Sequence, residues 1–177
     1  DYGEIDVVFG GGRKYFMPKQ VKDIESGSDG ARRDSRNLIE EAKGNGYRYI
    51  SRTSELDALN ADIKAGRDVG KVLGLFSPGM MAFELDRGSD VWGEPSLEEM
   101  TRAAIAILRK NPEGFFLMVE GGRIDHGHHY GNAYRALTDS TAFADAVAVA
   151  MEMTSETNTL ILVTADHSHT MTLSGYP

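Results

Sequence analysis

The sequence contains no cysteine. Disulfide bonds and thiolate metal sites are therefore excluded, so a metal ion would have to be bound through imidazole nitrogens and carboxylate oxygens. The absence of cysteine does not decide the redox compartment.

The sequence also lacks long apolar runs and an excess of basic residues. The longest apolar stretches, 115–119 and 160–163, have the length of strands and not of membrane-spanning helices. The net charge of -8 argues against non-specific nucleic-acid binding and against a basic membrane-binding patch. Binding of an anionic substrate would need local positive charge, which bound divalent cations supply.

Strand and helix patterns alternate along the 177 residues, which predicts a single α/β domain over residues 1–177. We expect three layers, with a largely parallel sheet flanked by helices. The expected strands are 5–9, 47–51, 72–76, 115–120 and 159–164, and the expected helices are 35–43, 54–60, 96–110 and 130–153.

Two of these helices carry more specific signals. Ser96 and Glu99 have the spacing of a capping box at a helix start. In the last helix an apolar stripe is expected to face the core, and it consists of Leu137, Thr141, Ala144, Val147 and Met151.

All five histidines lie in two short stretches, 119–129 and 164–169. The same stretches hold the carboxylates of Glu120, Asp125 and Asp166. Histidine is the commonest metal ligand, and its grouping with carboxylates favours metal binding over a chance polar surface.

The expected topology brings the two stretches together. Glu120 ends one expected strand and Asp166 follows the next, with one long helix between them. A strand–helix–strand crossover makes the two strands parallel, so their carboxyl ends lie at the same edge of the sheet. Ligand sites of open α/β sheets lie outside that edge.

The number of ligand candidates indicates more than one metal ion. The five candidates are Glu120, Asp125, His129, Asp166 and His167. One zinc ion takes about four ligands, and a carboxylate-rich position suits magnesium. Paired metals clamp the attacking and leaving oxygens of phosphoryl or acyl transfer, so the residues predict a polynuclear metallohydrolase, with phosphate esters as the best-suited substrates.

The residues Glu-Gly-Gly-Arg-Ile-Asp-His-Gly-His-His (120–129) and Thr-Ala-Asp-His-Ser-His (164–169) resemble two metal-binding motifs of the alkaline phosphatase family, in the form of its animal-type and some bacterial members. Gly-Gly-Gly-Arg-Lys-Tyr (10–15), Asn-Leu (37–38), Gly-Leu-Phe (74–76) and Asn-Pro-Glu-Gly-Phe-Phe (111–116) occur in the expected order. The resemblance covers nearly the whole chain and implies an incomplete part of that family's catalytic domain.

The resemblance implies roles for individual residues. Asp125 and His129 are similar to ligands of a first zinc, and Asp166 and His167 to ligands of a second. Glu120 is similar to a magnesium ligand. The remaining histidines match outer positions: His126 a contact to the phosphate, and His169 a residue that orients a ligating carboxylate.

Three further features of the motifs are less well matched. A calcium-like fourth site would use Glu41, the backbone of Phe76 and Glu94, but Ser77 stands where the family has a glutamate and Glu94 where it has an aspartate. His128 has no role in the family pattern. We expect Arg123 to form a structural ion pair and not a phosphate clamp.

The resemblance also implies a serine nucleophile that forms a phosphoserine, and this chain lacks the region that would carry it. Thr-Asp-Ser-Thr-Ala (138–142) looks like the nucleophile motif, but Ser140 falls in the middle of an expected helix, away from any strand end. The glycines 10–12 predict a tight turn and lack the lysine spacing of a phosphate-binding P-loop.

We therefore expect a zinc- and magnesium-dependent alkaline phosphatase that acts on phosphate monoesters, with this chain inactive alone. Two alternatives stay open: a non-catalytic metal-binding module, and a related metallohydrolase of the sulfatase or nucleotide pyrophosphatase kind. The resemblance further implies export to the periplasm or cell exterior and a homodimer; the residues themselves show neither.

Overall fold

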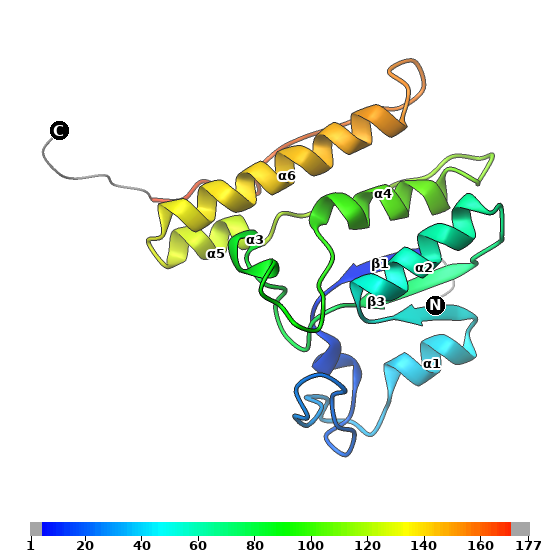
Figure 1. Cartoon of the computed structure of the whole chain (residues 1–177), viewed down its shortest axis with the longest axis vertical. Coiled ribbons are helices and arrows are strands. Elements are labelled where there is room, and N and C mark those ends of the chain that lie inside the picture. Colours follow the sequence, from blue (N-terminus) through cyan, green and yellow to red (C-terminus); the bar gives the residue numbers. More distant parts are fainter. Residues whose placement is uncertain (1–4, 171–177) are drawn as a thin grey trace, which may run out of the picture.

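The computed structural model describes residues 5–170 and contains a three-stranded parallel sheet (Figure 1). The strands are β1 (Val7–Gly10), β2 (Tyr47–Ile50) and β3 (Lys71–Leu75), in the order β1-β3-β2. Val7 is paired with Val72, and Tyr47 with Lys71. The three N-terminal strand predictions are confirmed.

Helices account for most of the remaining regular structure. They are η2 (Arg13–Phe16, a 3-10 helix), α1 (Leu38–Gly44), α2 (Thr53–Lys64), α3 (Glu84–Arg87), α4 (Leu97–Leu108), α5 (Arg123–His129) and α6 (Ala133–Met153). The Ser96 side chain accepts from the Glu99 amide while the Glu99 carboxylate accepts from the Ser96 amide, so the predicted capping box is present at the start of α4.

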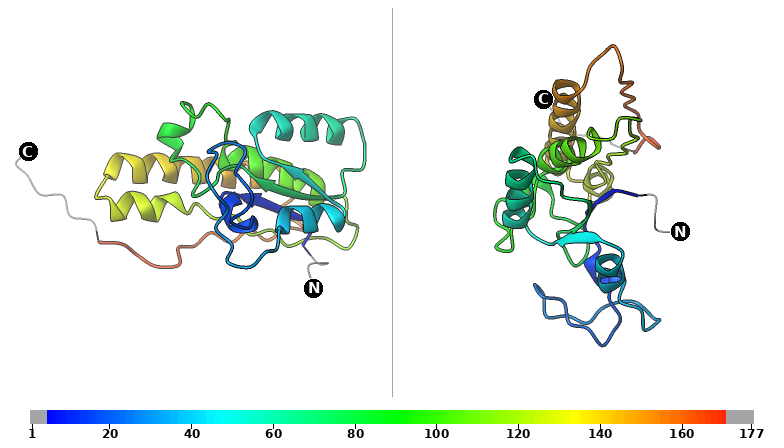
Figure 2. Two further views of the ribbon diagram at one scale, coloured as in Figure 1. Left: turned by 90° about the horizontal axis from the view of Figure 1, so that it is seen from below. Right: turned by 90° about the vertical axis from the view of Figure 1, so that its right-hand side faces the viewer.

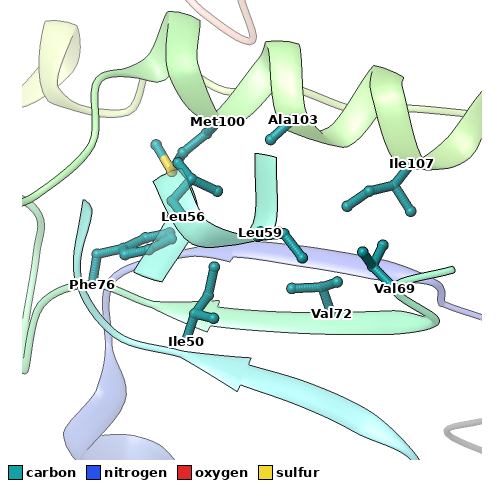
Figure 3. Close-up of a cluster of buried hydrophobic side chains, with 9 residues drawn as sticks. All are labelled: Ile50, Leu56, Leu59, Val69, Val72, Phe76, Met100, Ala103 and Ile107. Atoms are coloured by element: carbon teal, nitrogen blue, oxygen red, sulfur yellow. The ribbon is translucent and has the colours of Figure 1, made fainter. Parts of the chain in front are cut away.

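Side chains of β3 alternate between two apolar clusters, one on each face of the sheet. Figure 3 shows the first, in which α2 and α4 cover the sheet; its buried members are Ile50, Leu56, Leu59, Val69, Val72, Phe76, Met100, Ala103 and Ile107. The second lies under α1 and consists of Met17, Ile39, Leu73 and Leu75. Helices thus cover both faces, as Figure 2 also shows, and the predicted three-layer α/β class is confirmed.

The two C-terminal strand predictions, 115–120 and 159–164, are wrong for this structure. Both segments are extended but form no ladder within residues 5–170. The second runs back along α6 (Figure 1), and its Leu160 and Leu162 are exposed. An apolar run becomes a strand only where a neighbouring edge accepts its backbone hydrogen bonds, which neither segment reaches here.

The prediction of which face of α6 is buried is also wrong. Leu137 and Met151 of the expected stripe are exposed, whereas Ala136, Ala146 and Val149 are buried. The reason is that α6 packs on α4 and α5 and not on the sheet. Small alanine side chains allow two helices to approach closely, so the alanine-rich face is the one covered.

A buried ion pair holds the N-terminal loops to the end of the sheet. The Arg13 guanidinium is 1% exposed, binds both oxygens of Asp23 and donates to the carbonyl of Leu75. Trp92, the single tryptophan, lies beside it: the Arg13 guanidinium is 5.8 Å from the indole ring, and that of Arg52 is 4.1 Å away.

The pKa of Asp23 predicts a loss of stability in acid. Burial alone raises this pKa, but hydrogen bonds from Arg13 and from the backbone amides of Ser26 and Glu25 outweigh it and lower the pKa to about 2. A lowered pKa stabilises the fold above the unfolded value of 3.8, and this contribution, about 2 kcal/mol, is lost as the pH falls from 3.8 towards 2.

Circular dichroism during an acid titration measures this effect. The parent should lose stability steeply below pH 4, whereas Asp23→Asn should be less stable at neutral pH and change less between pH 4 and 2. Equal slopes for the two proteins in that interval would contradict the assignment to Asp23.

No helix within residues 5–170 is long and apolar enough to cross a membrane.

Candidate metal centre

The first histidine stretch folds as the short helix α5, which presents a carboxylate and an imidazole on one face. Residues four apart on a helix are neighbours, and the Asp125 Oδ2 and His129 Nε2 atoms are 3.3 Å apart. Asp125 in the first turn also complements the helix dipole. The sequence-based expectation that this stretch places Asp125 and His129 together is confirmed.

The second histidine stretch reaches the same carboxylate. Asp125 Oδ1 lies 3.9 Å from His167 Nε2 and 3.9 Å from His169 Nε2. One ligand atom from each of Asp125, His129 and His169 lies within 4.8 Å of the other two. The two stretches therefore meet, although no pair of parallel strands in residues 5–170 brings them there.

Two polar atoms of α5 are buried without a hydrogen-bond partner, Asp125 Oδ1 in the metal-ligand group and His126 Nδ1 next to it in the sequence. A buried carboxylate oxygen is costly unless something compensates its charge. A cation bound between the carboxylate and the surrounding imidazoles would do so, and imidazole with carboxylate suits zinc. The residues present therefore fit a metal ion.

Asp166 and Glu120 lie outside this three-residue group. The Asp166 side chain is 89% exposed, accepts from the amide of His167 and lies 3.5 Å from its Nε2. His167 thus stands between Asp166 and Asp125. Glu120 is exposed at the end of its extended segment.

The electrostatics of His167 favour binding of a positive charge. Its hydrogen bond to the carbonyl of Ser168 and the charge of Asp166 raise its pKa, although the ring is exposed. A metal ion has to displace a proton from this ring, so binding there should be weaker at lower pH.

His128 and His169 make contacts that the sequence did not predict. His128 Nδ1 lies 2.8 Å from the carbonyl oxygen of Ile124, and its ring stacks on His169 at 5.3 Å between centroids. His169 also meets the ring of His129 edge-on at 4.7 Å. Spacing along the chain carries no signal for the two contacts of His169, because they join segments about forty residues apart.

The carboxylates considered for a calcium-like site bind other groups in this structure. Glu41 on α1 is bound to Arg36 and exposed. Glu94 is buried, accepts from the amide of Ala82, and has a pKa raised by burial. Within residues 5–170 the one acidic or histidine group with metal-ligand geometry is the one around Asp125.

Ser140 and the glycine triplet 10–12, the two other features that resemble phosphate-binding motifs, make other contacts in the structure. The Ser140 hydroxyl donates to the Ala136 carbonyl inside α6, where no strand end or helix start exposes it. Gly12 has a φ of 82° and its amide donates to the Gly79 carbonyl. The glycine triplet is therefore a turn, as expected, and the Gly12 amide in it is already occupied.

Gly127 allows α5 to lie close to α6. A Cβ atom there would be 2.7 Å from the Ala136 backbone nitrogen, and its φ is not in the positive range. Gly127→Ala should therefore force the helices apart and destabilise the fold by about 1–3 kcal/mol, with weaker zinc binding.

Thermal unfolding and zinc titration check the Gly127 prediction. Gly44→Ala, at a helical site where a Cβ would meet nothing within 4 Å, is the matched control; it should leave zinc binding unchanged and should not lower the melting temperature. An unchanged melting temperature for Gly127→Ala would show that the helices are not in contact there.

Fold and site together define an α/β protein with a carboxylate–histidine cluster formed by α5 and the 164–169 stretch. The alkaline phosphatase family model matches residues 1–177. The chain belongs to the alkaline phosphatase family.

Curated relatives and solved structures agree with this assignment. The chain is 45% identical to the tissue-nonspecific alkaline phosphatase of Gallus gallus and 47% identical to that of Homo sapiens, in each case over 98% of its length. These matches cover 34% and 33% of the two relatives, so the chain spans about a third of their length. The crystal structure of Thermus thermophilus alkaline phosphatase superposes with a TM-score of 0.63 at 33% identity, over 81% of this chain and 26% of that one. That of a cold-active enzyme from Shewanella gives 0.61 at 28%, over 83% and 29%.

Proposed function

We propose that this chain supplies metal ligands of an alkaline phosphatase that hydrolyses phosphate monoesters. The observation that carries the proposal is the gathering of His129, His167 and His169 around the Asp125 carboxylate, whose buried Oδ1 has no hydrogen-bond partner. Membership of the family supports metal dependence in general. Zinc and magnesium in particular, and the substrate class, belong to the proposal.

Asp125 and His129 would hold one zinc ion, and Asp166 and His167 a second. The 3.3 Å approach of Asp125 to His129 supports the first pair, and the contact of Asp166 with His167 supports the second. Glu120 would hold magnesium. We assign no calcium ion, because Glu41 and Glu94 have separate partners.

When bound, the metal ions would supply Lewis acidity and concentrated positive charge in a chain of net charge -8. The residues themselves bind and orient. Asp125 would provide the charge that holds a cation, and His169, whose Nε2 lies 3.9 Å from Asp125 Oδ1, would help to orient its carboxylate. His126, with an unpartnered ring nitrogen, can contact a phosphate oxygen. A serine beyond this chain would be phosphorylated; Ser140 is excluded by its place inside α6.

Metal analysis combined with a phosphatase assay tests the proposal. The full chain should bind zinc tightly after dialysis, and a polypeptide that combines it with the family's serine-bearing region should hydrolyse p-nitrophenyl phosphate. Zinc binding without hydrolysis by that polypeptide would favour the non-catalytic module. Failure to bind zinc would overturn the proposal.

The related-hydrolase alternative is assessed by substrate choice. An identity of 45–47% to alkaline phosphatases over 98% of the chain weighs against a sulfatase or nucleotide pyrophosphatase. A polypeptide that cleaves p-nitrophenyl sulfate or a nucleotide diester faster than p-nitrophenyl phosphate would reverse this choice. Export and a homodimer are parts of the proposal that rest on the family alone.

A further inference from the structure

Arg123 occupies a position that helix energetics do not favour. It is the first residue of α5, where the helix dipole disfavours positive charge, and it lies two residues before the proposed ligand Asp125. A cation so placed gains nothing from the helix and repels a nearby metal ion. We therefore expect the stabilising contacts of the Arg123 side chain to be with groups outside α5.

The Arg123 side chain leaves α5 and contacts the segment that follows β3. Its Nε donates to the carbonyl oxygen of Met81 at 2.6 Å, and its guanidinium lies 4.3 Å from the ring centroid of Phe83. Phe83 is 5% exposed. The ion pair expected from the sequence is thus replaced by a backbone acceptor and an aromatic face.

The acceptor that Arg123 uses is itself fixed to the sheet. The neighbouring Ala82 amide donates to the buried Glu94 carboxylate, and Gly79 accepts from Gly12, which follows β1. The Met81 carbonyl is therefore held in place by contacts on either side of it. Arg123 connects this fixed point to the start of the helix that carries Asp125 and His129.

Phe83 also contacts the other end of α5. Tyr130, directly after the helix, meets the Phe83 ring at 6.0 Å between centroids. Arg135 of α6 places a second guanidinium 4.7 Å from the same ring and binds Asp86 of α3. Residues at both ends of α5 thus contact the buried Phe83 ring. Of these, Arg123 also donates a hydrogen bond to the segment that carries Phe83, at the Met81 carbonyl.

We propose that Arg123 is a positioning residue for the metal centre, which sets the direction of Asp125 and His129 by tying the start of α5 to Met81 and Phe83. The inference rests on the proposed zinc site. It assigns Arg123 no contact with substrate or metal.

The test compares Arg123→Gln with Arg135→Gln in the full chain, with Zn²⁺ and Co²⁺ as the probes. Arg135→Gln removes a guanidinium from the same Phe83 ring but leaves the tie between α5 and Met81 intact. We expect Arg123→Gln to weaken zinc binding by about 10- to 100-fold, the usual effect of losing a group that orients a ligand. It should also change the visible d–d absorption of the Co²⁺ form, which reports ligand geometry.

Arg135→Gln should lower the melting temperature of the metal-free chain while keeping the parent's Co²⁺ spectrum. Arg123→Lys, which can still donate to Met81, should recover part of the lost zinc affinity. The inference is overturned if Arg123→Gln keeps the parent's zinc affinity and Co²⁺ spectrum, whatever its melting temperature. If the parent itself binds no zinc, the proposed function fails and this inference with it, so the two failures are distinguishable.

Discussion

Asp125→Ala is expected to abolish tight zinc binding, because this carboxylate is the group that lies near all three histidines of the cluster. It lies 3.3 Å from His129 and 3.9 Å from both His167 and His169. Zinc bound by about four protein ligands is held by about 10–16 kcal/mol, so one ligand is worth about 3 kcal/mol, or about a hundredfold in affinity. Isothermal titration with zinc measures the loss.

Removal of Asp125 should at the same time cost the metal-free fold little. Its Oδ1 is buried without a hydrogen-bond partner, so the substitution deletes an unsatisfied group and breaks no bond at that atom. Asp145→Ala, which removes an exposed carboxylate on α6, is the control and should bind zinc as the parent does. Parent-like zinc affinity in Asp125→Ala would mean that the cluster is not the metal site.

Arg13→Met is expected to cause the largest loss of stability. The substitution leaves Asp23 buried with a negative charge and no cation, and also removes the donor to the Leu75 carbonyl. Breaking a buried ion pair in this way costs about 3–5 kcal/mol. For a domain of this size the melting temperature should fall by about 6–20 °C.

The exposed ion pairs provide the matched comparison. Arg102 on α4 binds Glu98 and Glu152 with its side chain 43% exposed, and Arg102→Met should cost at most about 1 kcal/mol. The double substitution Arg13→Met and Asp23→Leu should recover much of the loss, since no unpaired charge remains. If Arg13→Met and Arg102→Met melt alike, the Arg13 pair does not stabilise the fold as described.

The parts of the fold that could be predicted are those in which local and tertiary preferences agree. β1 and β3 are short, largely apolar runs next to glycine, and β2 is a short run rich in tyrosine that follows Gly46. The start of α4 is specified by Ser96 and Glu99 alone. The pairing of Asp125 with His129 likewise follows from helix spacing. Each of these depends on residues only a few positions apart.

The parts that could not be predicted depend on which partner a surface meets. Leu137 and Ala136 are adjacent on α6, and the sequence cannot say that the alanine face meets α4 and α5 while leucine stays exposed. Apolar runs at 115–120 and 160–163 have strand composition but no neighbouring edge among residues 5–170. The approach of His169 to Asp125 is a tertiary contact of the same kind. Gly127 inside α5 and the alanine residues of α6 are the local features that permit close helix packing.

Trp92 lies beside the N-terminal ion pair of Arg13 and Asp23, so its fluorescence can be followed separately from metal binding at α5. Its indole nitrogen donates to the Ser51 carbonyl, and its ring is flanked by the guanidinium groups of Arg13 and Arg52. As the single tryptophan, it gives fluorescence that reports the environment of the N-terminal ion pair. Zinc titration at α5 should leave the Trp92 emission unchanged. Disruption of the ion pair between Arg13 and Asp23 should quench the emission. One intrinsic fluorophore thus distinguishes a change in the scaffold from a change at the metal ligands.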